Sequence, residues 1–64
     1  MSLNYKVGSV IEYRNYGNQL VQVEVDQKDE DIKNGRPGFA GYRMDDKNHG
    51  VWGYDYQITR VVKL

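Results

Sequence analysis

Hydrophobic and polar residues alternate most strictly in residues 20–25, which have the sequence LVQVEV. Val21, Val23 and Val25 point to one side of an extended chain, and the polar residues between them point to the other. A period of two with one apolar side is typical of a β-strand that has one buried face. No segment shows the i, i+3, i+4, i+7 spacing of apolar residues that an amphipathic helix requires. The pattern therefore predicts an all-β protein.

Other segments are rich in β-branched and aromatic residues and are bounded by turn-forming residues. The predicted strands are residues 9–13, 20–25, 39–44, 51–54 and 58–64. Residues 26–38 are predicted to be a charged loop with a tight turn at Asn34-Gly35, because both residues tolerate positive φ. Residues 55–57 are predicted to form one 3₁₀ turn before the last strand. Pro37 cannot donate a ladder hydrogen bond, so we expect it at a strand start or on an edge.

Short strands separated by turns favour a β-sandwich or a β-barrel. A chain of 64 residues is too short for two packed sheets, so we predict a small, strongly bent barrel. Strands that turn a corner need glycines or bulges, and Gly41 and Gly53 lie within predicted strands where such bends are expected. Residues 1–6 are expected to form an N-terminal tail, in part a remnant of cloning, and residues 7–64 a single domain.

The segments VGSVIEYRN, LVQVEV, PGFAGYRM and GVWGYDYQITRVV together resemble the SH3-like barrel superfamily, which includes SH3, Tudor-like and KOW-type folds. The resemblance covers residues 7–63 and implies a five-stranded, strongly bent SH3-like barrel with a short 3₁₀ turn before the last strand. SH3 domains that bind polyproline carry an acidic first loop and a proline in the 3₁₀ turn. Here the segment RNYGNQ has no acid and the turn has no proline, so polyproline recognition is not expected. Free-standing barrels of this kind are often small bacterial or phage proteins.

The charge balance and the missing residue types exclude several kinds of site. Nine basic and nine acidic residues cancel, which disfavours a dedicated nucleic-acid binder because phosphate contacts supply most non-specific affinity. There is no cysteine and His49 is the only histidine, so thiolate and multi-histidine metal sites are excluded. No apolar run approaches the ~20 residues of a membrane span, and no signal peptide is visible. We expect a cytoplasmic protein without a cofactor.

The polar motifs fit no catalytic or ion-binding pattern. In the acidic segment, a calcium loop started at Asp26 or at Asp29 fails to place its oxygen ligands and its glycine correctly. Asp45 and Asp46 lie in a predicted turn, where aspartate is favoured for backbone reasons. His49 has no serine on a nucleophile elbow, and the NGRPG segment lacks the Walker spacing. We therefore expect a protein that is not an enzyme.

The aromatic residues are the most informative feature, because the chain has six tyrosines and one tryptophan. A stripe on one side of the barrel is predicted for Tyr13, Tyr16, Trp52, Tyr54 and Tyr56. Such a stripe stacks on nucleic-acid bases, cages a methylated lysine or anchors a protein partner. The competing interpretation is that Trp52 and one or two tyrosines form the core, since large aromatics bury much area in a small protein.

These observations favour a non-enzymatic interaction module that binds a protein partner through an aromatic-rich face. The residues expected to contact the partner are Tyr16, Trp52, Tyr54 and Tyr56, with Arg14 and Arg43 on the rim. One alternative is a barrel that binds single-stranded RNA or DNA through the same aromatics. Another is a structural protein that forms a homodimer. Arginines around an exposed aromatic patch would favour nucleic acid, and mixed charges would favour a protein.

Overall fold

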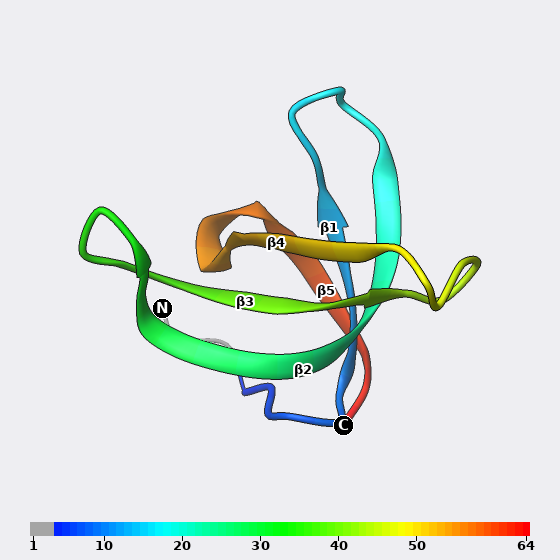
Figure 1. Ribbon diagram of the computed structural model, residues 1–64, viewed down its shortest axis with the longest axis horizontal. Helices are drawn as coiled ribbons and strands as arrows, with labels where there is room; N and C mark the ends of the chain where they lie inside the picture. Colours follow the sequence, from blue (N-terminus) through cyan, green and yellow to red (C-terminus); the bar gives the residue numbers. More distant parts are fainter. Residues whose placement is uncertain (1–3) are drawn as a thin grey trace.

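The computed structural model describes residues 4–64 and is shown in Figure 1. Its elements are β1 (Val10–Arg14), β2 (Leu20–Lys33), β3 (Arg36–Arg43), β4 (Gly50–Tyr54), the 3₁₀ turn η1 (Asp55–Gln57) and β5 (Ile58–Lys63). The strands form one antiparallel five-stranded sheet in the order β4-β3-β2-β1-β5. The predictions of an all-β protein and of a 3₁₀ turn before the last strand are confirmed. Closure of this sheet into a barrel stays a prediction.

β2 is the longest strand and connects the two parts of the sheet. It pairs with β1 along its first half and with β3 along most of its length, and Figure 1 shows it curving from one part of the sheet into the other. The register between β2 and β3 shifts between Val25 and Gln27, so Asp26 is the extra residue of a β-bulge. Bulges bend the strand that contains them. This bulge therefore marks the place where the sheet turns.

The prediction that residues 26–38 form a loop is wrong, because residues 26–33 continue β2 and β3 begins at Arg36. The tight turn itself is confirmed. Asn34 and Gly35 have φ values of 59° and 72°, the pair of positive angles that a two-residue type I′ hairpin requires. The long arm of the hairpin was missed because Ile32 is the only apolar residue among residues 26–33, so the arm carries no hydrophobic alternation.

The two glycines predicted at bends lie where neighbouring atoms leave no room for a side chain. Gly41 pairs with Val25 beside the bulge, and a Cβ there would collide with the carbonyl oxygen of Glu24 and lie 2.9 Å from its carbonyl carbon. A Cβ on Gly53 would lie 2.9 Å from the ring Cζ of Phe39. Real Cβ atoms almost never approach other heavy atoms this closely. The close approach of chain segments at both positions therefore depends on glycine.

The hydrophobic core consists of Tyr5, Ile11, Tyr13, Val21, Val23, Val25, Phe39 and Ile58. Phe39 is fully buried, and the rings of Tyr5 and Tyr13 meet it edge-on at centroid distances of 6.5 and 5.1 Å. The buried face predicted for residues 20–25 is confirmed. Because Tyr5 packs in this core, the domain begins before the predicted boundary at residue 7. The predicted cloning remnant, residues 1–3, lies outside the described residues.

Membrane insertion through a helix finds no support in the described part of the chain. Its helical element is the single turn η1, and no helix within residues 4–64 is long and apolar enough to cross a bilayer.

Candidate binding surface

Four aromatic side chains, Tyr16, Tyr56, Tyr54 and Trp52, form a continuous line of contacts that we call the aromatic row. The hydroxyl oxygens of Tyr16 and Tyr56 are 3.0 Å apart and share a hydrogen bond. The rings of Tyr56 and Tyr54 are stacked, with centroids 5.2 Å apart and planes within 12°. The Trp52 ring meets Tyr54 edge-on at 5.4 Å and 82°. The structure thus brings together the four aromatic residues singled out from the sequence.

Three rings of the row are open to solvent, with exposed fractions of 78% for Tyr16, 65% for Tyr56 and 45% for Trp52. Tyr54 is only 7% exposed, yet it lies outside the core cluster, between the rings of Trp52 and Tyr56. The interpretation that Trp52 forms the core is therefore wrong. The prediction that Tyr13 joins the aromatic stripe is also wrong, because Tyr13 packs against Phe39 in the core.

Tyr16 projects from the turn between β1 and β2. Hydrogen bonds between residues on either side of Tyr16 close this turn. The carbonyl oxygen of Asn15 accepts a hydrogen bond from the Asn18 N–H, and its side-chain oxygen accepts one from the Gln19 N–H, both at 2.9 Å. Asn18 adopts φ = 63°, a left-handed conformation that asparagine tolerates better than most residues. The backbone of the turn, and with it the base of the Tyr16 side chain, is fixed by these bonds.

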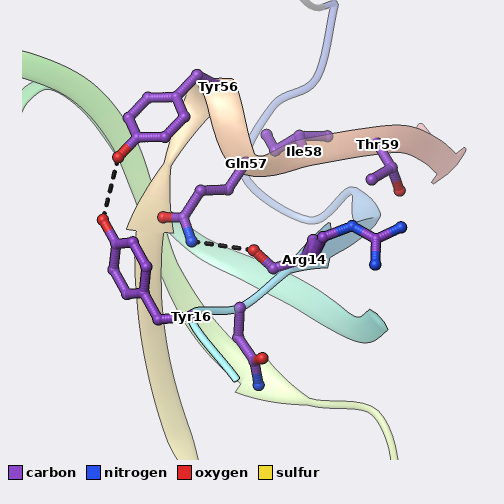
Figure 2. A pocket seen from close by; sticks show the side chains of 7 residues that line it. Arg14, Tyr16, Tyr56, Gln57, Ile58 and Thr59 are labelled. Carbon is purple, nitrogen blue, oxygen red and sulfur yellow. Dashed lines mark hydrogen bonds between the residues drawn. The ribbon is translucent and has the colours of Figure 1, made fainter. Parts of the chain in front are cut away.

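Gln57 fixes η1, which carries Tyr56, to the end of β1 (Figure 2). Its Oε1 accepts a hydrogen bond from the Tyr54 N–H at 2.9 Å, and its Nε2 donates one to the Arg14 carbonyl at 3.0 Å. The Gln57 side chain is nearly buried, so these bonds exchange little with water. Tyr56 is thereby held beside Tyr16, although the two residues are 40 positions apart in the sequence.

A hollow of about 300 Å³ lies beside the tyrosine end of the row, lined by residues 14–16 and 56–59 (Figure 2). Figure 2 shows the hydroxyls of Tyr16 and Tyr56 pointing toward each other on one side of this hollow. The hydrogen bond with Tyr56 raises the pKa of Tyr16 above its ordinary value. A ligand in the hollow would meet hydroxyl donors and acceptors beside ring edges.

Two cations that the sequence interpretation missed lie close to the row. The Lys33 Nζ is 5.4 Å from the centroid of the Trp52 ring, within the range of a cation–π interaction. Arg36 is near enough to Tyr16 for its charge to offset part of the rise in the Tyr16 pKa. Lys33 and Arg36 pair across the turn at residues 34–35. A sequence prediction of a long hairpin with its tip at residues 34–35 would have placed Lys33 and Arg36 side by side.

The two predicted arginines lie in different surroundings. Arg14 lines the hollow, and its Nη1 donates a hydrogen bond to Asn18 at 3.1 Å. Arg43 forms two hydrogen bonds with the carboxylate of Asp45, at 2.9 and 3.0 Å, and this guanidinium lowers the Asp45 pKa. Arg43 is five residues along β3 from Gly38, which pairs with Tyr54. That is roughly 17 Å at about 3.3 Å per residue, so the structure does not bring Arg43 to the tyrosine end of the row.

Within residues 4–64 no group of three or more His, Cys, Asp or Glu side chains is placed to hold a metal. The surface presents aromatic rings, two tyrosine hydroxyls that share a hydrogen bond, and positive charges.

The chain matches no protein family, no curated protein and no solved structure. The candidate surface is therefore defined by the geometry of this chain alone. The resemblance to the SH3-like superfamily stays a prediction.

Proposed function

We propose that this protein is a non-enzymatic SH3-like module of the cytoplasm that binds a protein partner through the aromatic row. The observation that carries the proposal is that some aromatic residues form the core and others are exposed on the surface. The core is complete with Tyr5, Tyr13 and Phe39, whereas Tyr16 and Tyr56 are largely exposed. Tyrosine, tryptophan and arginine are the residue types that contribute most to protein interfaces.

The row is ordered before any partner arrives, which favours binding. Each of its rings contacts the next one, and Gln57 and the turn at Asn15 fix the backbone on both sides. Ordering a side chain on association costs about 0.5–1.5 kcal/mol, so rings that are already in place avoid most of that cost. The hollow between Arg14 and Tyr56 is large enough to receive a side chain of the partner.

Single-stranded nucleic acid is the second candidate, and the positions of Lys33 and Arg36 favour it. Lys33 lies over the Trp52 ring, and the charge of Arg36 acts on Tyr16 through space. Cations beside aromatics form the usual surface for single-stranded binding. The ring packing favours a protein instead. Tyr54 and Tyr56 stack on each other and Lys33 lies over Trp52, so fewer ring faces are open for bases. The net charge of zero also favours a protein.

Replacing Tyr16 and Tyr56 together by alanine is expected to weaken partner binding by at least about tenfold, because two interface aromatics each contribute roughly 1 kcal/mol or more. The fold should remain, since both side chains are exposed and lie outside the core. The measurement is the enrichment of proteins from a lysate of the source organism on immobilised wild-type and double-variant protein, quantified by mass spectrometry. Circular dichroism reports whether the variant is folded.

Val7→Ala with Val62→Ala is the matched control, because these two apolar side chains are also exposed but take no part in the ring and hydroxyl contacts of the row. Its enriched proteins should equal those of the wild type. Equal enrichment by the Tyr16→Ala, Tyr56→Ala variant would refute the proposal. Tight binding of a fluorescent oligonucleotide at low salt, lost in the same variant, would replace the protein partner with single-stranded nucleic acid. Concentration-dependent sedimentation of the wild type alone would indicate a homodimer.

A further inference from the structure

A second hollow, of about 280 Å³, lies on the outer face of β3 and β4 between the rings of Trp52 and Tyr42. We call it the slot. Its walls come from the register of the two strands, in which Ala40 pairs with Trp52 and Tyr42 pairs with Gly50. Paired residues point to the same face of a sheet, so the two rings stand on diagonal corners of this group of four. Both rings are close to half exposed, at 45% and 44%.

The floor of the slot is kept low by small residues. Gly50 and Ala40 occupy the other two corners, so nothing larger than a methyl group stands between the rings. A Cβ placed on Gly50 would meet no atom closer than 3.9 Å, and one of its nearest atoms is the Cε1 of the Tyr42 ring. Gly50 is not among the glycines whose φ angle is positive. The backbone there would accept a side chain, and the absence of one leaves the slot open.

The rim of the slot is acidic. Asp26, the extra residue of the β2 bulge, lines it directly. Glu24 pairs with Tyr42 and so points to the same outer face, where Lys47 Nζ lies 3.9 Å from its carboxylate. A carboxylate beside aromatic rings stabilises a bound cation, because the negative charge and the negative face of a ring both attract it.

The chain itself places a cation against one of these rings, the Lys33 ammonium over Trp52 at 5.4 Å from the centroid. In the strand register Lys33 lies toward the start of β3, opposite Arg36, whereas Tyr42 lies toward its end. Lys33 and the slot are therefore on opposite sides of Trp52 along the sheet. The slot remains open for a cation that comes from outside the chain.

We propose that the slot binds the side chain of an arginine from a partner segment. A guanidinium is planar and stacks on aromatic faces, and it donates two parallel hydrogen bonds to a carboxylate such as Asp26. The slot supplies the groups for both contacts, because two aromatic rings and one acidic residue line it. The slot shares only Trp52 with the aromatic row. Its test is therefore independent of the function proposed for Tyr16 and Tyr56.

The probes are the peptide acetyl-Gly-Arg-Gly-amide and its citrulline counterpart, which has the same shape without the charge. Trp52 is the only tryptophan, so its indole N–H gives a single site-specific signal in a ¹H–¹⁵N spectrum. At low salt the arginine peptide should shift this signal with a dissociation constant in the millimolar range, and the citrulline peptide should leave it unchanged. Equal shifts from the two peptides would overturn the proposal.

Variants locate the response. Gly50→Val fills the floor with a residue that strands favour, and it should weaken binding of the arginine peptide by about tenfold. Asp26→Asn should weaken it by about threefold, as expected for an exposed charge pair. If Gly50→Val does not fold, Tyr42→Ala serves instead, because it removes an exposed wall of the slot. Unchanged affinity in the folded variant would overturn the proposal, and so would a peptide response at Tyr16 without one at Trp52.

Discussion

Replacing Gly41 by alanine is expected to lower the free energy of unfolding by about 3 kcal/mol or more, because the new methyl group would collide with backbone that cannot move aside. The colliding atoms are the carbonyl oxygen and carbon of Glu24, with a methyl group of Val23 at 3.0 Å. A domain of 64 residues is stabilised by only about 3–10 kcal/mol in total. Urea or thermal denaturation followed by circular dichroism should show a protein that is marginally folded or unfolded.

The control for this prediction is Gly50→Ala, one strand away. A Cβ at Gly50 has no neighbour closer than 3.9 Å, so alanine there should be neutral or stabilise the fold by about 0.4–1 kcal/mol through the unfolded chain. Comparing Gly41→Ala with Gly50→Ala separates a steric requirement at one position from a general loss of stability when any strand glycine is replaced. Equal stability of the two variants would contradict the steric requirement for glycine at position 41.

Replacing Gln57 by leucine is expected to cost about 2–4 kcal/mol of stability, because a buried N–H and a partly buried carbonyl of the backbone would lose their partner. These groups are the N–H of Tyr54 and the carbonyl of Arg14, which Gln57 joins at 2.9 and 3.0 Å. Leucine has a similar volume and no polar side-chain atoms. The loss of stability therefore comes from the missing hydrogen bonds and not from a cavity. Chemical denaturation measures the change in unfolding free energy.

The same variant should also disturb the aromatic row, since Gln57 ties η1 to β1. In the folded fraction of Gln57→Leu, the nuclear Overhauser effects between the rings of Tyr16 and Tyr56 should weaken. Gln27→Leu is the control, because Gln27 is an exposed glutamine on β2 and its replacement should change stability by less than about 0.5 kcal/mol. A Gln57→Leu protein as stable as Gln27→Leu would contradict the role assigned to Gln57.

The fold was predictable in segments where the burial of one face produces an alternation of apolar and polar residues, or where a turn selects particular residues. The valines of residues 20–25 alternate because one face of β2 packs on the core, and the Asn34-Gly35 pair is selected by its positive φ angles. Residues 26–33 gave no such signal. They are polar apart from the half-buried Ile32, and they form a strand because β3 pairs with them, with the buried Phe39 on β3 opposite Lys28. That stabilisation is tertiary, and no local pattern reports it.

The binding surface was predictable only in part for the same reason. The predicted aromatic stripe included Trp52 and Tyr54, but the sequence pattern could not show that Trp52 is exposed and Tyr54 is buried. Tyr54 is buried because Tyr56 reaches over it from η1, and Tyr56 is held there by Gln57. Tyr5 was assigned to a tail because its burial depends on contacts with residues far along the chain, such as Phe39.

The most direct test of the proposed binding surface is site-specific photo-crosslinking in cells of the source organism. A benzophenone side chain is introduced in place of Tyr56, in the exposed row, and separately in place of Val62, on β5. If the aromatic row is the binding surface, position 56 gives a discrete adduct with another protein and position 62 gives none. Adducts from position 62 with none from position 56 would contradict it.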